Sequence, residues 1–356
     1  MEPAAPEPTE FSITVSRHFA AWLAEQKTSL AFTIPPAKLF MIGLKPDGDL
    51  SIYERTFSKS MGLARHGDHT LYLGTLYQLW RLESPLQPGQ LYENEYDRLY
   101  IPRRMHVTGT MNVHDVSVDA AGRPIFVNTR FGCLATVSDQ FSFVPLWQPP
   151  FLPDLTPGDK CHLNGLAMRD GQMAYATCVS RTAVINGWRD QRRDGGCVID
   201  IASDEIVTTG LSMPHSPRWY RDQLWLTNAG SGEFGRANLE RGRFEPATFV
   251  PGFARGLCFV GDYAVVGTSK PRHGNLYSGL ALDDELARRK MDAKLGLFVV
   301  DLPSGQITDW LFIDAPDLRE LFDVVALPGV RQPMALGLLA PDIQTNLWFP
   351  TEVAGL

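Results

Sequence analysis

Apolar residues recur along the chain in short alternating stretches, and six of these stretches open with a similar phrase. Each phrase has a polar or bulky residue, then a second, usually small or acidic, residue, and then alternating apolar positions. The phrases are Met61-Gly62-Leu63-Ala64, His114-Asp115-Val116-Ser117, Asn164-Gly165-Leu166-Ala167, Pro217-Arg218-Trp219-Tyr220, Arg255-Gly256-Leu257-Cys258 and Phe322-Asp323-Val324-Val325. Their second positions lie 53, 50, 53, 38 and 67 residues apart. Repeats near this period, each built of short strands, predict an all-β, six-bladed β-propeller.

A second apolar stretch follows each of the first five phrases after a turn rich in glycine and aspartate. These stretches cover residues 71–75, 125–129, 174–178, 224–228 and 264–268, and further strands are expected at 77–82 and 297–302. Glycine and aspartate supply the backbone angles that tight turns need. Strands and turns at this density indicate four-stranded blades and exclude a fold of alternating strands and helices.

The two ends of the chain and one insertion depart from the repeat. Residues 1–10 are rich in proline and glutamate, which predicts a disordered tail, and the residues from His18 to Ser29 favour a helix. A hairpin of residues 38–44 and 50–53 precedes the first phrase, and the strand-like stretch 346–349 is expected to help close the ring. We therefore expect an N-terminal tail and helix over 1–34 and a propeller over 35–356. The polar stretch 282–293 predicts a helical insertion before the last blade, either a surface helix or a cover over the axis.

The composition of the chain limits which binding partners and which cellular compartment are expected. The formal net charge is −7, which argues against a nucleic-acid-binding surface and against a polybasic membrane patch. The five cysteines are odd in number and none forms a C-x-x-C pair, so a disulfide framework and a cysteine zinc site are not expected. The N-terminus lacks a signal pattern and no apolar run reaches membrane-spanning length, which together predict a cytoplasmic, soluble protein.

Three of the eight histidines fall near the openings of blades. His162 and His215 each lie two residues before the phrase of their blade, and His114 lies two places later in its own pattern. Because the first strand of every propeller blade lines the central channel, these three side chains are expected to converge at one mouth. Three neutral imidazoles suit a divalent transition metal such as Fe, Mn, Zn or Cu. A polar ligand pocket without metal, or a purely structural use of the histidines, are the alternatives.

Other polar side chains fall near the same ring positions. Buried charges are costly unless they are paired or bind a ligand, so this ring is either an internal salt-bridge network or a binding site. Arginine suits carboxylate or phosphate, which favours a small polar or anionic ligand. The candidate ligand-binding residues are Asn112, Asp115, Asn164, Arg218, Asn228, Arg255 and Asp323.

No motif assigns a reaction. Glu233 and His106 are additional candidates for proton transfer, and the string Asn228 to Glu233 is either a tight turn or an anion-binding loop. The nucleophile-elbow, dinucleotide-binding and zinc-protease patterns are absent from the sequence. Whether the protein is an enzyme is therefore left open.

Several longer phrases are specific as a set. They are residues 111–116 (MNVHDV), 162–167 (HLNGLA), 213–219 (MPHSPRW), 224–233 (LWLTNAGSGE), 251–257 (PGFARGL), 267–272 (GTSKPR) and 320–324 (ELFDV). Together they resemble a bacterial family of conserved hypothetical proteins, some of which are fused to tetratricopeptide repeats. The resemblance covers roughly residues 35 to 350 and implies the propeller fold. It supplies no catalytic assignment.

Two classes of function follow from these observations. The first is a propeller with a polar pocket at its axis that binds a small anionic or polar molecule, in its sharper form with a metal held by His114, His162 and His215. The second is a non-catalytic scaffold that binds a protein partner through surface aromatic residues such as Trp147, Trp188 and Trp310.

Overall fold

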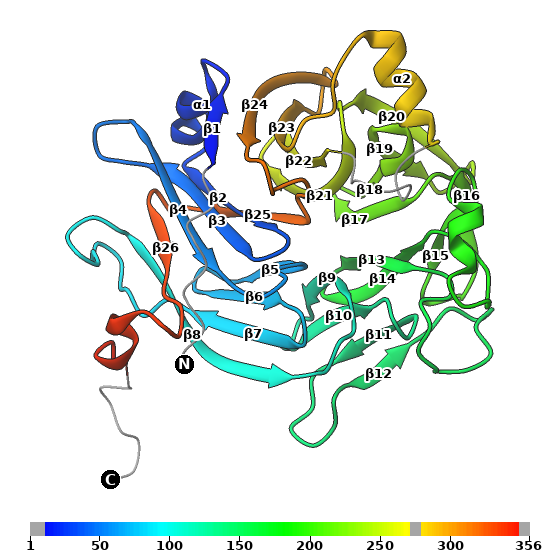
Figure 1. Ribbon diagram of the computed structural model, residues 1–356, viewed down its shortest axis with the longest axis horizontal. Helices are drawn as coiled ribbons and strands as arrows, with labels where there is room; N and C mark the ends of the chain where they lie inside the picture. The colour runs from blue at the N-terminus through cyan, green and yellow to red at the C-terminus, as the bar shows by residue number, and fades with distance from the viewer. Residues whose placement is uncertain (1–10, 271–278, 349–356) are drawn as a thin grey trace.

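The computed structural model describes residues 11–270 and 279–348, and these form six β-sheets arranged as blades around one axis (Figure 1). Four sheets have four strands and two have five. The innermost strands are β5 (Leu63–His66), β9 (Val113–Val118), β13 (Leu163–Arg169), β17 (Pro214–Tyr220), β21 (Phe253–Val260) and β25 (Asp323–Pro328). Each of the six opening phrases overlaps one of these strands, so the predicted six-bladed propeller is confirmed.

The outer strands complete each blade in antiparallel order. The second strands are β6 (Thr70–Gly74), β10 (Pro124–Asn128), β14 (Gln172–Cys178), β18 (Gln223–Asn228), β22 (Tyr263–Ser269) and β2 (Thr28–Ile34). The third strands are β7 (Gln78–Glu83), β11 (Cys133–Thr136), β15 (Gly196–Asp200), β19 (Glu233–Asn238), β23 (Gly296–Asp301) and β3 (Lys38–Leu44). The fourth are β8 (Arg98–Val107), β12 (Val144–Trp147), β16 (Ile206–Leu211), β20 (Arg243–Phe249), β24 (Gln306–Asp314) and β4 (Leu50–Thr56).

The ring closes within one blade built from both ends of the chain. β25 is its innermost strand and pairs with β2, which is followed outward by β3 and β4. The hairpin expected before the first repeat is therefore β3 and β4 of this closing blade. The stretch 346–348 forms no strand, and Phe349 lies outside the described residues. In its place the short strand β26 (Pro333–Ala335) pairs in parallel with β8.

The N-terminal region is only partly helical. α1 spans Phe19–Glu25, whereas the helix was expected to continue to Ser29. Residues 28–34 instead form β2, which is buried at every position and lies between β25 and β3. The propeller sheet thus includes residues assigned from sequence to the N-terminal segment. β1 (Ser12–Val15) also joins a blade, as a fifth strand beside β24. The tail expected for residues 1–10 lies outside the described residues.

The helix in the insertion is α2 (Ala281–Arg289), which connects β22 to β23 within the β21 blade. Its buried leucines, Leu282 and Leu286, pack in one apolar cluster with Trp188, Met213 and Phe253. Trp188 belongs to the short helix η1 (Gly187–Gln191), and two further short helices are η2 (Ala229–Ser231) and η3 (Pro341–Gln344). Within the described residues, no helix has the length and apolar character needed to span a membrane.

The cysteines fit the expectation of unpaired, mostly buried thiols. Cys133, Cys161, Cys178 and Cys197 are buried, Cys258 is half-buried, and all five are free. Burial raises the pKa of the Cys133 and Cys258 thiols to about 12, which keeps both protonated at neutral pH.

Side chains tie neighbouring innermost strands together near the axis. The Asp323 carboxylate accepts a hydrogen bond from Leu63 N at 2.9 Å, and the Asp115 carboxylate accepts one from Leu166 N at 3.1 Å. At a third junction between blades, Gly256 N donates to the Ser216 hydroxyl at 2.9 Å. The acceptors come from β25, β9 and β17, and the donors from the next blade in each case. Every second blade is thus held in register with the blade that follows it.

A matching set of threonines donates across the same three junctions. The Thr129 hydroxyl donates to Leu163 O at 2.6 Å and the Thr227 hydroxyl to Ala254 O at 2.8 Å. The Thr33 hydroxyl donates to Met61 O and accepts a hydrogen bond from Asp323 N at 3.2 Å. Buried polar groups lose free energy unless they are paired, so these hydroxyls stabilise one relative placement of each blade pair.

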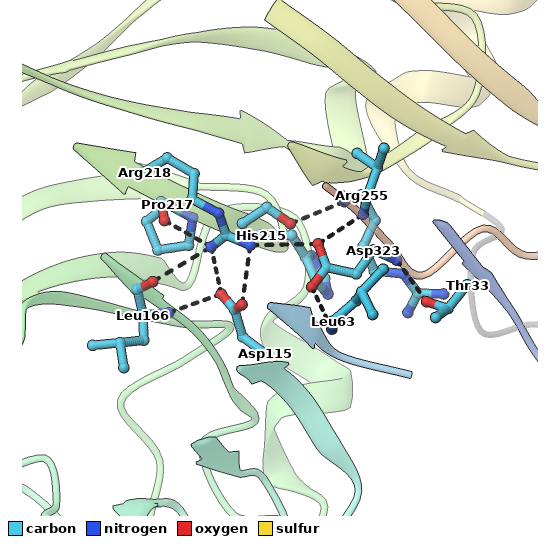
Figure 2. Close-up of polar contacts among 12 residues, drawn as sticks. Thr33, Leu63, Asp115, Leu166, His215, Pro217, Arg218, Arg255 and Asp323 are labelled. Carbon is cyan, nitrogen blue, oxygen red and sulfur yellow. Dashed lines mark hydrogen bonds and ion pairs between the residues drawn. The ribbon is translucent and has the colours of Figure 1, made fainter. Parts of the chain in front are cut away.

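Arg218 crosses the axis between two aspartates (Figure 2). Its guanidinium donates to both oxygens of Asp115, at 2.7 and 3.0 Å, and to Asp323 at 3.4 Å. Both carboxylates are 2% exposed. The pKa of Asp323 is raised to about 7, mainly by burial. The Arg218 charge lowers this pKa, whereas the Asp115 charge raises it. We call Asp115, Arg218 and Asp323 the axial network, and their mutual pairing identifies this part of the polar ring as an internal salt-bridge network.

We predict that Thr33→Val lowers the free energy of unfolding by about 1–3 kcal/mol, because it leaves two buried backbone groups without their partner. Urea unfolding followed by fluorescence measures the change. Thr14→Val is the matched control, since Thr14 is exposed on β1, and its effect should stay within about 0.5 kcal/mol. Equal effects of the two substitutions would contradict the assigned role of the Thr33 hydroxyl.

We also predict that Asp323 makes the protein less stable as the pH rises toward 7. Its pKa of about 7 lies above the value near 3.9 of an unfolded aspartate, so the folded state holds a proton that the unfolded state has lost. The resulting slope approaches about 1.4 kcal/mol per pH unit and ends above pH 7. Asp323→Asn should remove this slope while keeping an acceptor for Leu63 N.

The measurement is urea unfolding of wild type and variant at pH 5, 6, 7 and 8. His114 and His215 have pKa values held well below the usual range, so they make stability rise with pH up to about 6.5. Because both proteins contain these histidines, the difference between the two curves isolates Asp323. Asp170→Asn, on a side chain 91% exposed, is the control. Parallel curves for wild type and Asp323→Asn would show that the residue carries no such proton.

Candidate functional site

The three predicted histidines converge at one mouth of the propeller. His114 lies in β9, His215 in β17, and His162 immediately before β13. One ring nitrogen from each lies within 4.8 Å of the other two. The rings of His114 and His162 are 4.7 Å apart between centroids, and those of His114 and His215 are 6.3 Å apart. The expected convergence is therefore observed.

Hydrogen bonds assign the same tautomer to all three rings. The His114 Nδ1 lies 2.9 Å from Asn112 O, and the His215 Nδ1 lies 2.9 Å from Met213 O. The His162 Nδ1 lies 2.9 and 3.0 Å from the two carboxylate oxygens of Asp159. Because all of these partners accept hydrogen bonds, each Nδ1 carries the proton. The lone pair of each neutral ring is then on Nε2.

The inter-blade threonine Thr129 also helps to fix His114. Its hydroxyl oxygen lies 2.8 Å from the His114 Nδ1, while its proton is donated to Leu163 O. The hydroxyl therefore accepts at the imidazole, which adds a second acceptor for the Nδ1 proton. The contact that places the β13 blade against the β9 blade thus also orients a histidine of the site.

Local backbone geometry explains why His114 and His215 are alike. The residues two places before them, Asn112 and Met213, have φ values of 51° and 49°, and in both cases that residue's carbonyl accepts from the histidine ring. The spacing of the phrases instead predicts that His162 and His215 are in phase. His162 itself has a φ of 52°, as does Lys59 at the opening of the β5 blade. His162 and Lys59 therefore share one kind of position, and His114 and His215 share another.

Burial keeps two of the imidazoles neutral. The pKa values of His114 and His215 are held well below the usual range, first by burial. The neighbouring His162 and the positive charge of Arg255 lower both further. Neutral imidazole is the form that binds a metal ion, so both rings are ready to act as ligands near neutral pH without losing a proton.

The arrangement fits a metal ion after a small contraction. A tetrahedral zinc ion with Zn–N distances of about 2.0–2.1 Å has ligand nitrogens roughly 3.3 Å apart, compared with up to 4.8 Å here. The rings therefore need to approach one another by about 1.5 Å at most. The amide nitrogen of Asn164 lies 3.4 Å from His215 Nε2, a long contact that a metal bond would replace. The Asp159–His162 pair matches the carboxylate–histidine arrangement that usually supports a ligand histidine.

The histidines line a cavity of about 210 Å³. Each blade contributes at least one lining residue at or just before its innermost strand, and one from each blade is Lys59, His114, His162, His215, Phe253 and Phe322. We call these six residues the mouth ring. The other lining residues are Pro35, Met61, Asn112, Asp159, Trp188, Arg189, Met213 and Arg255. Lys59, Arg189 and Arg255 are cations, whereas Asp159 is the one acidic residue among these lining residues.

Six of the seven predicted ligand-binding residues divide into two groups, and the seventh, Asn228, does not line the cavity. Asn112 and Arg255 line the cavity, and Asn164 contacts His215. Asp115, Arg218 and Asp323 belong to the axial network and do not line it.

Several of these residues also serve to hold the chain in place. Arg255 is paired with the buried Glu320 at 2.8 Å, and its guanidinium lies 3.9 Å from the centre of the Phe322 ring. The Asn228 side chain accepts a hydrogen bond from Ser212 N at 2.7 Å.

Trp188 has a different place from the one expected. It was proposed as a surface aromatic, but it is 2% exposed and its ring lies 4.1 Å from that of His162. Trp147 and Trp310 are half-buried; the Trp147 indole donates to Asp204, and Trp310 stacks on Phe312 at 4.2 Å. Trp188 therefore belongs to the cavity and not to an exposed docking surface.

Sequence reasoning also missed Lys59 and Asp159. Asp159 precedes His162 by three residues, a spacing that suits a carboxylate supporting a histidine. Lys59 precedes its blade's phrase by two residues, as His162 does, so alignment of the repeats would have found it.

Three solved structures are similar to this chain, and the first of them, with a TM-score above 0.5, supports the fold. A chain of the nidogen/laminin complex has a TM-score of 0.53 at 12% identity, over 85% of this chain and 99% of that chain. Virginiamycin B lyase from Staphylococcus aureus has a TM-score of 0.38 at 12% identity, over 72% and 96%. A protein of unknown function from Bacteroides caccae has a TM-score of 0.38 at 10% identity, over 84% and 98%.

At the level of sequence, no functionally curated protein matches the chain. A family profile does match, over residues 17–336, which is most of the chain and includes all six innermost strands. This match confirms the resemblance to a family whose activity is not established. The protein belongs to the family described as a domain of unknown function, DUF4915.

Proposed function

We propose that His114, His162 and His215 hold one divalent transition metal ion through their Nε2 atoms, and that the cavity binds a small anionic molecule beside it. The observation that carries this proposal is the convergence of three rings in one tautomer: every Nδ1 proton is already donated to an acceptor, and one ring nitrogen of each histidine lies within 4.8 Å of the other two. Fe, Mn, Zn and Cu all accept such imidazole ligands.

The mouth ring supports an exchangeable position on the metal. Only three of its six members are histidines, and Lys59, Phe253 and Phe322 offer no lone pair to a metal ion at neutral pH. Three protein ligands with an open position are typical of catalytic metal sites, whereas structural sites are closed by four. A bound metal would supply Lewis acidity to a ligand at that position.

The charges around the cavity favour an anion. Lys59 and Arg189 add positive charge, while the carboxylate of Asp159 is committed to His162 and Arg255 is paired with Glu320. A divalent ion would add further positive charge. A small anion therefore gains attraction from several directions.

We predict that untagged wild-type protein, incubated with Zn²⁺ or Co²⁺ and desalted, retains about one metal ion per chain. The thermal midpoint should rise with metal and fall again in chelator, because only the folded state presents the three ligands together. Elemental analysis and thermal unfolding are the measurements. His162→Ala should lose the bound metal, and His106→Ala, on β8 away from the cavity lining, should keep it. Metal retention by His162→Ala, or none by wild type, would overturn the proposal.

We further predict that Asp159→Asn weakens metal affinity by about 10–100-fold, since the amide supports His162 less well than the carboxylate does. Competition with a chromophoric chelator gives the dissociation constant. Asp170→Asn is the control and should bind metal as wild type does. An unchanged affinity in Asp159→Asn would show that the carboxylate does not support a ligand.

A further inference from the structure

The connection between β14 and β15 forms part of the rim of the cavity. It covers residues 179–195 and includes η1, whose Trp188 and Arg189 line the cavity. It contains four arginines and two aspartates and no other charged residue. The connection is therefore formally positive, whereas the whole chain has a net charge of −7. A local positive region on an acidic protein attracts anionic partners to that region.

Two exposed apolar side chains lie within this connection. Val184 is 66% exposed and Ile185 is 60% exposed. Ile185 lies against the backbone of Gly158, because a Cβ built on that glycine would be 2.7 Å from Ile185 Cγ1. Asn186 N also donates to Gly158 O at 3.2 Å. The apolar pair is thus held beside Gly158, which directly precedes Asp159 of the cavity lining.

Exposed arginines lie on both sides of this contact. Arg181 and Arg189 flank the apolar pair within the connection, and Arg130 O accepts hydrogen bonds from Gly158 N at 2.9 Å and Asp159 N at 3.0 Å. All three arginine side chains are exposed, and none of them is paired with a carboxylate among the described residues. We call this set the arginine patch: Arg130, Arg181, Val184, Ile185 and Arg189.

The arginine patch suits a partner that carries carboxylates and apolar side chains together. A guanidinium group donates paired hydrogen bonds to a carboxylate. The Arg189 guanidinium lies 4.7 Å from the centre of the Trp188 ring, and this stacking limits its freedom before a partner arrives. Val184 and Ile185 gain free energy when apolar groups of a partner cover them. A polyanion without apolar groups, such as polyphosphate, would leave both side chains in water.

The charge of the rest of the protein favours a short partner segment over an extended surface. Exposed charges act over about 10 Å at moderate salt, so a short segment on the arginine patch meets mainly the arginines. A membrane or a nucleic acid also meets neighbouring parts of a chain whose net charge is −7. The patch therefore favours a short acidic segment of polypeptide.

We infer that the arginine patch binds a short acidic polypeptide segment of a partner protein. Its carboxylates contact Arg130, Arg181 and Arg189, and its apolar side chains cover Val184 and Ile185. This inference goes beyond the proposed function, because the patch lies at the rim of the cavity and its binding needs no metal. A segment bound there covers part of the rim and so limits access to the cavity.

The test measures binding of a fluorescein-labelled synthetic peptide, made of glutamate and leucine in equal number, to the full-length protein by fluorescence anisotropy. Added salt should weaken the binding, because the ion pairs are exposed. The triple variant Arg130→Gln/Arg181→Gln/Arg189→Gln should bind about tenfold more weakly or worse, since each exposed ion pair contributes about a two- to fivefold effect. Val184→Ser/Ile185→Ser should also weaken binding by about tenfold.

Matched control variants change the same chemistry elsewhere. Arg103→Gln/Arg104→Gln/Arg243→Gln removes the same charge from exposed residues of β8 and β20, the fourth strands of their blades. Val107→Ser, on a β8 side chain that is 63% exposed, is the control for the apolar pair. Both controls should bind the peptide as wild type does. All variants alter exposed side chains, so their thermal midpoints should match that of wild type.

Equal peptide affinities of wild type and the triple arginine variant would overturn the inference, as would an equal loss in the control triple variant. Tighter binding of phosphatidylserine vesicles or of single-stranded DNA than of the peptide would overturn the assignment of a polypeptide partner.

His162→Ala, and wild type in chelator, should both retain peptide binding. Loss of binding in either case would place the peptide in the cavity and overturn the assignment of the arginine patch. Because peptide binding is expected without metal, failure of the metal proposal and failure of this inference are distinguishable.

Discussion

The fold depends on hydrogen bonds between side chains of one innermost strand and the backbone of the next innermost strand. Asp323, Asp115 and Ser216 each accept a backbone hydrogen bond from the following blade, and three threonines donate across the same junctions. The cavity is assembled from six strand openings that are far apart in sequence. A shift of one blade by a fraction of a residue would move its mouth-ring side chain out of the cavity. The hydrogen bonds at the β9–β13 junction therefore help to fix the distance between His114 and His162.

The charged residues near the axis show that a sequence alone does not distinguish a ligand-binding charge from one paired inside the protein. Asp115, Arg218 and Asp323 are all candidates for ligand binding in the sequence, and in the structure Arg218 is paired with both aspartates. A buried charge needs a counter-charge, and either a ligand or another side chain supplies it equally well. Only the direction of each side chain distinguishes the two, and the register of β17 shifts between His215 and Arg218, just before the arginine. The spacing of the phrases does not predict this register shift.

Much of the architecture could be predicted because blades repeat a local pattern. The opening phrases and the second strands are periodic, and their burial follows from having a blade on each face. The N-terminal segment is harder to assign, because residues 28–34 pair on one side with the nearby β3 but on the other with β25, nearly 300 residues away. The convergence of the histidines followed from the fold, whereas Trp188 did not, because it lies in a connection between strands and no repeat predicts its position. Local pattern thus predicts the strands, and long-range packing decides which side chains share the cavity.

The closing blade combines residues from both ends of the chain, and this has a consequence for synthesis. Until β25 has emerged, β2 has no inner neighbour, and its hydrogen-bonding edge is open to other strands. Phe322 immediately precedes β25, so the mouth ring also lacks one member until that moment. A nascent chain therefore carries an unprotected sheet edge and an incomplete cavity through most of translation. Closure of the ring and completion of the pocket are a single, late event.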